Sequence, residues 1–383
     1  GDGAGGRRAP QPGEIFSNPD LAKSLTLLAE NGCPAFYDGP IAEAIDKFGG
    51  VGGTKIRKAD LKAHRGEWVT PINTTYRGRY RIFELPPNPQ GAAALQMLNL
   101  LEGYNLTAMG HNSADFLHVQ VEAKKLAFAD AAKYYADPDF AKIPLQGLIS
   151  KSYADKRRAE INLDSAAQTD HCGYPDEEEM ESKYAGDTTY LTAADEEGNM
   201  VSLIQSNYNG FGSGLVVPGL GFALQDRGAL FAMKQDHANV YSPKKRPFHT
   251  IMPGFASKDD QPWLSFGVMG GFMQPQGQVQ ILSNMIDFGL GVQEAGDAAR
   301  YYHTGSTQPT GQVMVAGGVV ELEDGVCDEV VKDLRSRGHN IIRRPNGGGY
   351  QAIMRQKVTY PHGDGFAFSA ASEMRKDGQA VGY

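Results

Sequence analysis

The sequence is poor in features that mark several common classes of protein. Its three cysteines, Cys33, Cys172 and Cys327, are odd in number, far apart and without Cys-x-x-Cys spacing, so they predict neither a disulfide framework nor a zinc site. No run of about 18 apolar residues occurs, and a membrane-spanning helix is therefore not expected. Basic residues are outnumbered, 37 against 45 acidic ones, for a formal net charge of −8. Because an acidic chain attracts phosphate backbone poorly, we expect no nucleic-acid partner.

The composition is that of a folded protein. Hydrophobic residues make up 41% of the 383 positions and charged residues 21%, which excludes a disordered or fibrous chain. Residues 1–8 resemble neither a signal peptide nor a helix start, but the middle of a loop. This predicts that the numbering begins inside a longer protein, and it leaves a periplasmic, secreted or cytoplasmic location open.

The first half of the chain is mostly helical in pattern. Asn18 is a capping residue, Pro19 suits a first helical turn, and Gly32 ends the helix that follows. Further helices are expected over residues 41–45, 92–101 and 114–136, and a later one over 278–288. Alternating residues predict paired strands at 67–76 and 80–85, and again at 188–195 and 200–207 around a hairpin turn. The acidic stretch 165–187 is typical of a solvated, flexible linker.

Several motifs of common enzymes are absent. The sequence has no Gly-x-Ser-x-Gly elbow, no His-Glu-x-x-His pair, no Walker loop and no dinucleotide-binding glycine motif. His118 and Glu122 share a helix face, but no second histidine lies at metal-binding spacing. The nine histidines are scattered singly, so we expect no metal and no cofactor.

The junction between Asp187 and Thr188 has a possible chemistry of its own. A threonine can cleave amides when it is the first residue of a chain, because its α-amino group then serves as the general base. That amine has an ordinary pKa of about 7.7–8.0, whereas a peptide nitrogen has no basicity. The Asp187–Thr188 bond would therefore have to be cut first, by attack of the Thr188 hydroxyl on the Asp187 carbonyl. On pattern alone, an ordinary strand threonine is the better interpretation.

Seven sequence blocks resemble the γ-glutamyltranspeptidase family. The run from Asp187 to Asp195, DTTYLTAAD, is similar to that family's autoprocessing site. The other blocks are residues 85–87 (LPP, with Gly91), 98–102 (LNLLE), 122–130 (EAKKLAFAD), 243–247 (PKKRP), 267–271 (GVMGG) and 371–375 (ASEMR, continuing to the end). Together they cover essentially the whole chain. Residues 269–277 are more similar to the γ-glutamyltranspeptidase-like amidohydrolases and acylases.

The resemblance implies an α+β fold, the αββα four-layer sandwich of N-terminal nucleophile hydrolases. It implies one domain, cut into a large subunit that ends with residues 1–187 and their flexible acidic tail, 165–187, and a small subunit of residues 188–383. The two would remain together as a heterodimer. The family's first portion has no counterpart here, so either the numbering omits a preceding segment or the protein is an unusually short member.

The resemblance also implies roles for individual residues. Thr188 would be the nucleophile and, once cleaved, the base. Gly270 and Gly271 match the glycine pair whose backbone N–H groups form the oxyanion hole, where glycine permits close approach. Ser206 falls where the family has a hydroxyl that orients the nucleophile, although a solvated strand serine is an equal alternative.

The substrate-binding positions depart from the family. The aspartate that holds the substrate's amino group falls at Leu230, which cannot pair with an ammonium. The family's serine pair becomes His249-Thr250, and its asparagine after the hydroxyl strand becomes Tyr208. We keep Tyr208, Arg227, Arg246, His249 and Thr250 as candidates for substrate binding. Arg246 and His249 are candidates for meeting a carboxylate, and a structural ion pair is the alternative for Arg246.

The sequence therefore predicts an autoprocessed threonine amidohydrolase. Its substrate would be a small amide whose acyl group bears a carboxylate, and water or an amine would resolve the acyl-enzyme. The first alternative is a true γ-glutamyltransferase or glutathione hydrolase. The second is an uncleaved homologue without catalytic activity.

Overall fold

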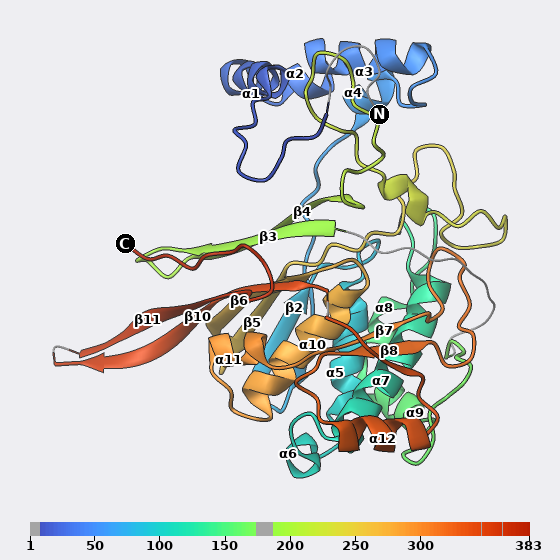
Figure 1. The fold of residues 1–383 in the computed structure, drawn as a ribbon, viewed down its shortest axis with the longest axis vertical. Coiled ribbons are helices and arrows are strands. Elements are labelled where there is room, and N and C mark those ends of the chain that lie inside the picture. The colour runs from blue at the N-terminus through green and yellow to red at the C-terminus, as the bar shows by residue number, and fades with distance from the viewer. Residues whose placement is uncertain (1–7, 174–186, 346, 362) are drawn as a thin grey trace. The chain divides into compact units, whose positions relative to one another are not determined.

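The computed structural model describes residues 8–173, 187–345, 347–361 and 363–383 (Figure 1). The chain forms two compact units. The first comprises Gly1–Glu67 and Phe211–Gln225, and the second comprises Trp68–Gly210 and Asp226–Tyr383. Each unit takes residues from both sides of Thr188, so the subunit boundary expected there does not coincide with the boundary between the compact units.

The helices of the first unit are α1 (Pro19–Asn31), α2 (Pro34–Tyr37), α3 (Pro40–Gly50) and α4 (Lys58–Ala63). The strands of the second unit are β1 (Ile72–Tyr76), β2 (Tyr80–Glu84), β3 (Asp187–Ala194), β4 (Met200–Tyr208), β5 (Gly254–Lys258), β6 (Gln261–Met269), β7 (Tyr301–Thr304), β8 (Val319–Leu322), β9 (Ile341–Arg343), β10 (Gly349–Tyr360) and β11 (Gly363–Ser372). Its helices are α5 (Gly91–Leu101), α6 (Leu106–Met109), α7 (Ala114–Tyr134), α8 (Leu145–Leu148), α9 (Lys151–Arg158), the 3-10 helix η1 (Arg227–Leu230), α10 (Met273–Ile286), α11 (Val292–Asp297) and α12 (Asp328–Ser336).

The first unit is a small helical cluster with its own core. Asn18 caps α1 as predicted, because its side chain accepts from the Leu21 N–H, and the helix ends at Gly32. The Asn18 amide also donates to the Gly221 carbonyl at 2.7 Å, which fastens the 211–225 segment to α1. Ile41 and other apolar residues of α3 pack against Val217 and Leu220 of that segment.

The second unit is built on a six-stranded sheet in the order β1-β2-β5-β6-β10-β11, with every neighbouring pair antiparallel (Figure 1). Helices α5 and α10 pack on this sheet, and α7 packs against α5. The β3–β4 hairpin lies on the opposite face. Val268 of β6 contacts Gly277 of α10, whereas Gly267, whose Cα faces the other way, lies against the Tyr190 ring of β3. A separate sheet, β7-β8-β9, completes the unit.

Two local expectations differ from the structure. The strand expected to begin at residue 67 begins only at Ile72, because the partner strand β2 ends at Glu84, which pairs with Ile72. Residues 165–173 of the expected flexible tail are anchored. The Ala166 N–H donates to the Arg337 carbonyl at 2.7 Å, and the Gly173 N–H donates to Asp130 at 2.7 Å. The rest of that tail, 174–186, lies outside the described residues.

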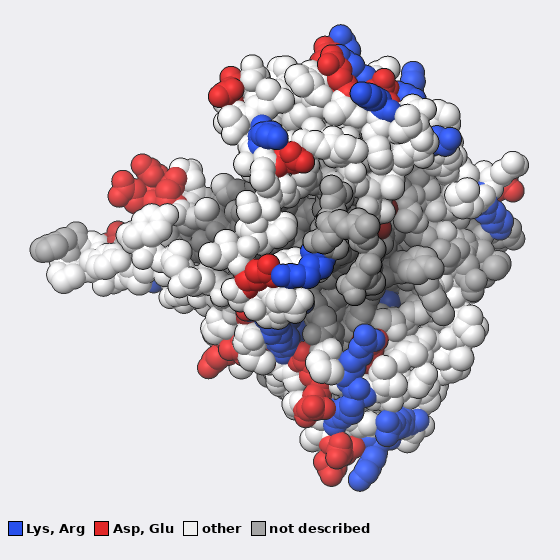
Figure 2. All heavy atoms as spheres, turned by 45° about the horizontal axis from the view of Figure 1, so that its top comes forward, with Lys and Arg blue, Asp and Glu red and all other residues white. Residues whose placement is uncertain are grey.

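Among the described helices, none combines the length and apolar character that a bilayer crossing requires. On the face drawn in Figure 2, acidic and basic side chains of the described residues are interspersed.

Candidate active site

Thr188 lies at an irregularity in the β3–β4 hairpin. From residue 194 back to residue 189 the strands pair in constant register, with Thr189 opposite Gln205, but Asp187 then pairs with Tyr208. Ser206 and Asn207 together therefore lie opposite the single residue Thr188, as in a β-bulge. Such bulges redirect side chains and are frequent beside active sites.

The bulge brings two hydroxyl groups together. The Thr188 hydroxyl donates to the Ser206 hydroxyl at 3.1 Å, and the Tyr208 backbone N–H donates to the same Ser206 oxygen at 2.8 Å. Tyr208 has a φ of 78°, which a bulky residue adopts only where its surroundings impose it. Thr188 is 6% exposed. Its hydroxyl is therefore held in one direction rather than free to rotate in solvent.

A cavity of about 360 Å³ opens beside this pair. Its lining residues are Thr188, Thr189, Gln205, Ser206, Asn207 and Gly210. Most of them are polar, and all belong to β3, to β4 or to the residues just after it. The space is large enough to admit a small molecule to the Thr188 hydroxyl.

Gly270 and Gly271 form the turn between β6 and α10. Their φ values, 127° and 58°, lie where residues with a Cβ are strained, and a Cβ on Gly270 would come within 3.1 Å of the Gly348 Cα. In the part of the chain that the structure describes, the backbone N–H groups of these two glycines donate no hydrogen bond. Two such N–H groups are what a developing oxyanion requires.

The stacking register brings Thr188 towards this glycine turn. Thr192 of β3 donates to Ser265 of β6 at 2.7 Å, and the Tyr190 ring lies against Gly267. A step from Thr192 back to Tyr190 on β3 therefore corresponds to a step from Ser265 forward to Gly267 on β6. If this correspondence continued for two more residues, Thr188 would lie over Met269, the residue that precedes Gly270.

Three of the candidate substrate-binding residues form one network. The Arg227 guanidinium stacks on the Tyr208 ring, 4.7 Å from its centroid, and donates to the Thr250 hydroxyl at 2.5 Å. Arg227 is 2% exposed, and burial lowers its pKa to about 10, so it remains a cation at neutral pH. Burial, together with the Arg227 charge, lowers the pKa of His249 to about 3. His249 is therefore neutral at physiological pH, and its Nδ1 accepts from the Ile251 N–H at 3.3 Å.

Arg246 and Leu230 make other contacts than those of the Arg227 network. The Arg246 guanidinium donates to Asp137 at 2.9 Å and to Asp139 at 3.0 Å, which is the structural ion pair that the sequence left open. Leu230 is 1% exposed and belongs to the core. Nearby Asp226 accepts from both the backbone and the side-chain nitrogen of Asn209, which fastens η1 to the residues after β4.

Sequence reasoning missed Gln90, whose buried side-chain amide donates to the carbonyls of Gly271 and Thr250. It also missed the cavity residues Gln205, Asn207 and Gly210. No motif distinguishes a single glutamine before a helix, so only its spatial partners could identify it. The polar run that ends β4 was the one available signal for the cavity residues.

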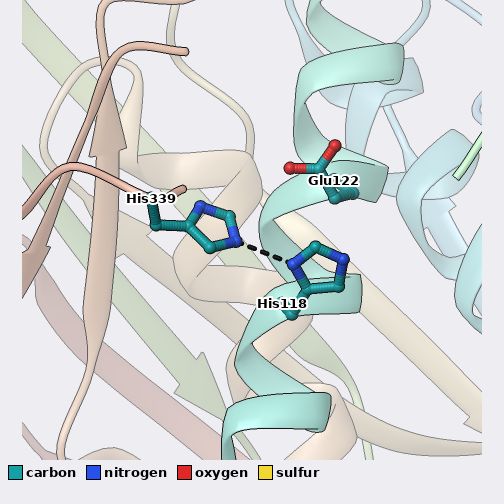
Figure 3. A group of neighbouring side chains, drawn as sticks. All are labelled: His118, Glu122 and His339. Atoms are coloured by element: carbon teal, nitrogen blue, oxygen red, sulfur yellow. Dashed lines mark hydrogen bonds between the residues drawn. The ribbon is translucent and has the colours of Figure 1, made fainter. Parts of the chain in front are cut away.

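The structure brings a second histidine to His118 and Glu122. The side chains of His118, Glu122 and His339 are buried, and their potential ligand atoms lie within 4.8 Å of one another (Figure 3). His118 Nε2 lies 2.8 Å from the Asn162 carbonyl and must carry the proton, so His118 Nδ1 accepts from His339 Nε2 at 2.8 Å. Sequence spacing could not reveal this group, because His339 is far along the chain.

The geometry of this group fits a hydrogen-bonded core better than a metal centre. Two nitrogens bound to one tetrahedral zinc, each about 2.0–2.1 Å away, lie roughly 3.3 Å apart, whereas those of His118 and His339 are 2.8 Å apart. The buried Lys125 ammonium lies 2.7 Å from Glu122 and would repel a cation. Burial lowers the pKa of both histidines, that of His339 to about 3, so the pair is neutral.

Comparison with known proteins identifies the family. Residues 4–383 match the family model described as gamma-glutamyltranspeptidase. The chain belongs to the gamma-glutamyltranspeptidase family. The resemblance seen in the sequence is therefore confirmed.

Individual members of the family are similar over nearly the whole chain. The "Glutathione hydrolase-like YwrD proenzyme" of Bacillus subtilis (strain 168) is 36% identical over 98% of this chain and 67% of its own length. The "Acylase ACY 1 proenzyme" of Pseudomonas sp. (strain SE83) is 36% identical over 91% of this chain and 59% of its own. The crystal structure of cephalosporin acylase from Bacillus halodurans matches with a TM-score of 0.85 at 40% identity, covering 98% of this chain and 64% of that one.

These matches confirm the mixed helix-and-sheet fold of the gamma-glutamyltranspeptidase family. The chain spans about three fifths to two thirds of the length of the relatives that it matches.

Proposed function

We propose that this chain carries the catalytic centre of an autoprocessing threonine hydrolase that cleaves the amide bond of a small acyl-amide. The observation that carries the proposal is the Thr188 hydroxyl, directed at Ser206 across the bulge and open to a cavity. The names of two similar relatives, both proenzymes, support it.

The proposed processing step cuts the Asp187–Thr188 peptide bond. The Thr188 hydroxyl attacks the Asp187 carbonyl, the C–N bond breaks, and the acyl group moves to the Thr188 oxygen as an ester. Water then hydrolyses the ester, which leaves a carboxylic acid on Asp187 and a free amine on Thr188. The products are a subunit ending with residues 1–187 and a subunit of residues 188–383, which remain together as a heterodimer. We assign the β3–β4 hairpin to the second sheet of an αββα four-layer sandwich.

In the proposed reaction the new α-amine takes the proton of the Thr188 hydroxyl as that oxygen attacks the substrate carbonyl. Ser206 holds the hydroxyl in line, and the Gly270 and Gly271 N–H groups stabilise the oxyanion. The amine product leaves with the proton. Water, or a second amine, then releases the acyl group and restores Thr188.

The proposed substrate carries a carboxylate on its acyl group. Arg227 is the cation that supports this assignment, because it is buried yet protonated and is held by Tyr208 and Thr250 near the end of β4. His249 would add a hydrogen bond rather than a charge, since its pKa is about 3. We do not assign Arg246 to the substrate, because its guanidinium is paired with Asp137 and Asp139.

The intact mass of purified protein tests the nucleophile. We expect two fragments that meet between residues 187 and 188 in the wild type, and one uncut chain for Thr188→Ala. Thr192→Ala is the matched control, because Thr192 is a threonine of the same strand whose hydroxyl donates to Ser265. It should be cut like the wild type. An uncut wild type, or a cut Thr188→Ala, would refute the proposal.

Turnover of chromogenic anilides tests the substrate class. We expect glutaryl-p-nitroanilide, whose acyl group ends in a carboxylate, to be hydrolysed faster than its uncharged butyryl analogue. Arg227→Met should remove this preference by raising KM for the glutaryl substrate alone. Equal rates on both substrates in the wild type would refute a carboxylate-bearing acyl group.

A glutathione hydrolase or γ-glutamyltransferase is the alternative. It is supported by the name of the Bacillus subtilis relative. Rapid release of p-nitroaniline from γ-glutamyl-p-nitroanilide, accelerated by a dipeptide acceptor, would favour it. An intact Asp187–Thr188 bond in mature protein that lacks turnover would instead identify a homologue without catalytic activity.

A further inference from the structure

Gln90 connects the glycine turn to the segment that carries Thr250. Its side chain is 1% exposed, and its Nε2 donates to the Gly271 carbonyl at 2.9 Å and to the Thr250 carbonyl at 2.5 Å. Gln90 itself is held in place as the residue that precedes α5, where its carbonyl accepts from the Ala93 N–H. One amide group therefore bridges two segments of the candidate active site.

The glycine turn needs such an external restraint. Glycine has few steric limits on its backbone, so the directions of the Gly270 and Gly271 N–H groups are set by what holds the turn. The Met273 N–H donates to the Gly270 carbonyl at 3.0 Å and thereby fixes the peptide plane that contains the Gly271 N–H. The next peptide plane is held through the Gly271 carbonyl, by Gln90 and by a longer bond of 3.3 Å from the Gln274 N–H.

The Thr250 segment has further anchors of its own. The His249 N–H donates to the Asn88 carbonyl at 3.0 Å, and the Asn88 side chain donates to the Pro247 carbonyl at 2.6 Å. Loss of the Gln90 amide should therefore loosen the glycine turn more than the Thr250 segment.

We propose that Gln90 is a positioning residue for the oxyanion hole. The inference rests on the proposed function, in which Gly270 and Gly271 supply the oxyanion donors. Gln90 does not touch the substrate. By holding the Gly271 carbonyl, it fixes the peptide plane that follows Gly271, and it thereby restricts rotation about the Gly271 backbone, on which the direction of the Gly271 N–H depends.

The first test replaces the amide without changing the length of the side chain. Gln90→Met should lower kcat for glutaryl-p-nitroanilide about ten- to a hundredfold, less than the loss of an oxyanion donor itself, while KM changes by less than about threefold. The matched control is Gln280→Met. Gln280 is also buried and donates to two backbone carbonyls, those of Gln276 and Tyr301, further along α10. Its kcat per folded molecule should equal that of the wild type.

The second test uses a carboxyl group at the same position. The carboxylate of Gln90→Glu has no hydrogen to donate and faces two carbonyl oxygens, whereas its protonated form can donate to one of them. The ratio of its kcat to that of the wild type should therefore rise as the pH falls from 8 to about 5, in the range that a buried carboxyl shifted upward would titrate. A residue with a purely structural role would leave this ratio constant.

The outcomes separate the inference from the proposed function. Wild-type kcat and KM in Gln90→Met, or a change in KM alone, would overturn the role of Gln90 while leaving Thr188 in place. If Gln90→Met does not fold, the pH dependence of the Gln90→Glu ratio decides, and a constant ratio overturns the inference. A wild type that is neither cut before Thr188 nor active would refute the proposed function, and the inference with it.

Discussion

Two groups of polar side chains in the second unit are both assembled from distant parts of the chain. One is the proposed Thr188 site, to which we assign Thr188 of β3, Ser206 of β4 and the glycine turn after β6. The other is the buried cluster of His118, Glu122 and His339 on α7 and just after α12 (Figure 3). By residue type alone, the cluster is the more suggestive of the two, because histidine and glutamate are common catalytic and metal-binding residues.

The difference lies in what remains available to a ligand. In the cluster, His118 bonds to His339 and to a backbone carbonyl, and Glu122 accepts from Lys125 and from the Ala167 N–H. At the Thr188 site, a hydroxyl borders a cavity, and two glycine N–H groups have no acceptor among the described residues. A reactive centre requires access and unused hydrogen-bonding capacity. The cluster is buried and uses most of its capacity internally, with His339 Nδ1 the one ring nitrogen of the pair that has no partner among the described residues.

The comparison predicts that breaking the buried cluster costs stability. Lys125→Met leaves the Glu122 carboxylate buried without its cation, so we expect the free energy of unfolding to fall by about 3–5 kcal/mol. Urea unfolding measures it. The matched control is Lys23→Met, which removes an exposed ion pair with Asp20 at the same i, i+3 spacing and should change stability little. Equal effects of the two substitutions would contradict the structural role.

Substitutions at the Thr188 site should instead lower kcat. Ser206→Ala removes the acceptor of the Thr188 hydroxyl, and we expect kcat to fall about a hundredfold, roughly 2.7 kcal/mol, with little loss of stability. Ser202→Ala is the control, because Ser202 lies on the same face of β4 but bonds to Tyr190. Steady-state kinetics of the cleaved enzymes compares them, and a Ser206→Ala enzyme as fast as wild type would exclude an orienting role.

The cluster should also make stability depend on pH. Burial, then electrostatic interactions with Lys125, His118 and Arg337, lower the pKa of His339 to about 3, below the roughly 6.5 of an unfolded histidine. The unfolded chain therefore binds the extra proton, so this contribution is complete above pH 6.5 and is lost as the pH falls towards 3. At pH 5 the loss is roughly 2 kcal/mol. Denaturant unfolding at pH 7 and pH 5 should show that His339→Gln loses less unfolding free energy on acidification than the wild type. An equal loss in the two proteins would contradict this role of His339.

The smallest expected effect concerns His249. Its pKa of about 3, set by burial and Arg227, keeps it neutral wherever the enzyme works. The acid limb of kcat/KM should therefore follow the Thr188 α-amine, whose ordinary pKa is about 7.7–8.0. We expect His249→Asn to change KM modestly and to leave that limb in place. A shift of about one pH unit or more would show that His249 itself titrates in the working range.

Local sequence signals determined many of the elements. Asn18, Pro19 and Gly32 delimit α1, and the alternation on either side of the 196–199 turn predicted β3 and β4. These signals are short-range, because caps, prolines and strand alternation act within a few residues. The family was predicted from several ordered blocks that resemble the sequences of its members, and not from periodicity. The match to the family model confirms that prediction.

Tertiary structure alone decided which side chains meet. The bulge that turns Ser206 towards Thr188 depends on pairing between two strands, and the link from Gln90 to Gly271 joins residues 181 positions apart in the chain. The same is true of His339 beside His118, which no spacing along the chain could predict. Arg246 could equally have met a substrate or an acidic partner, until the fold brought Asp137 to it. Sequence specifies the local conformations, and packing between distant segments selects the contacts, because those contacts depend on how the elements are stacked.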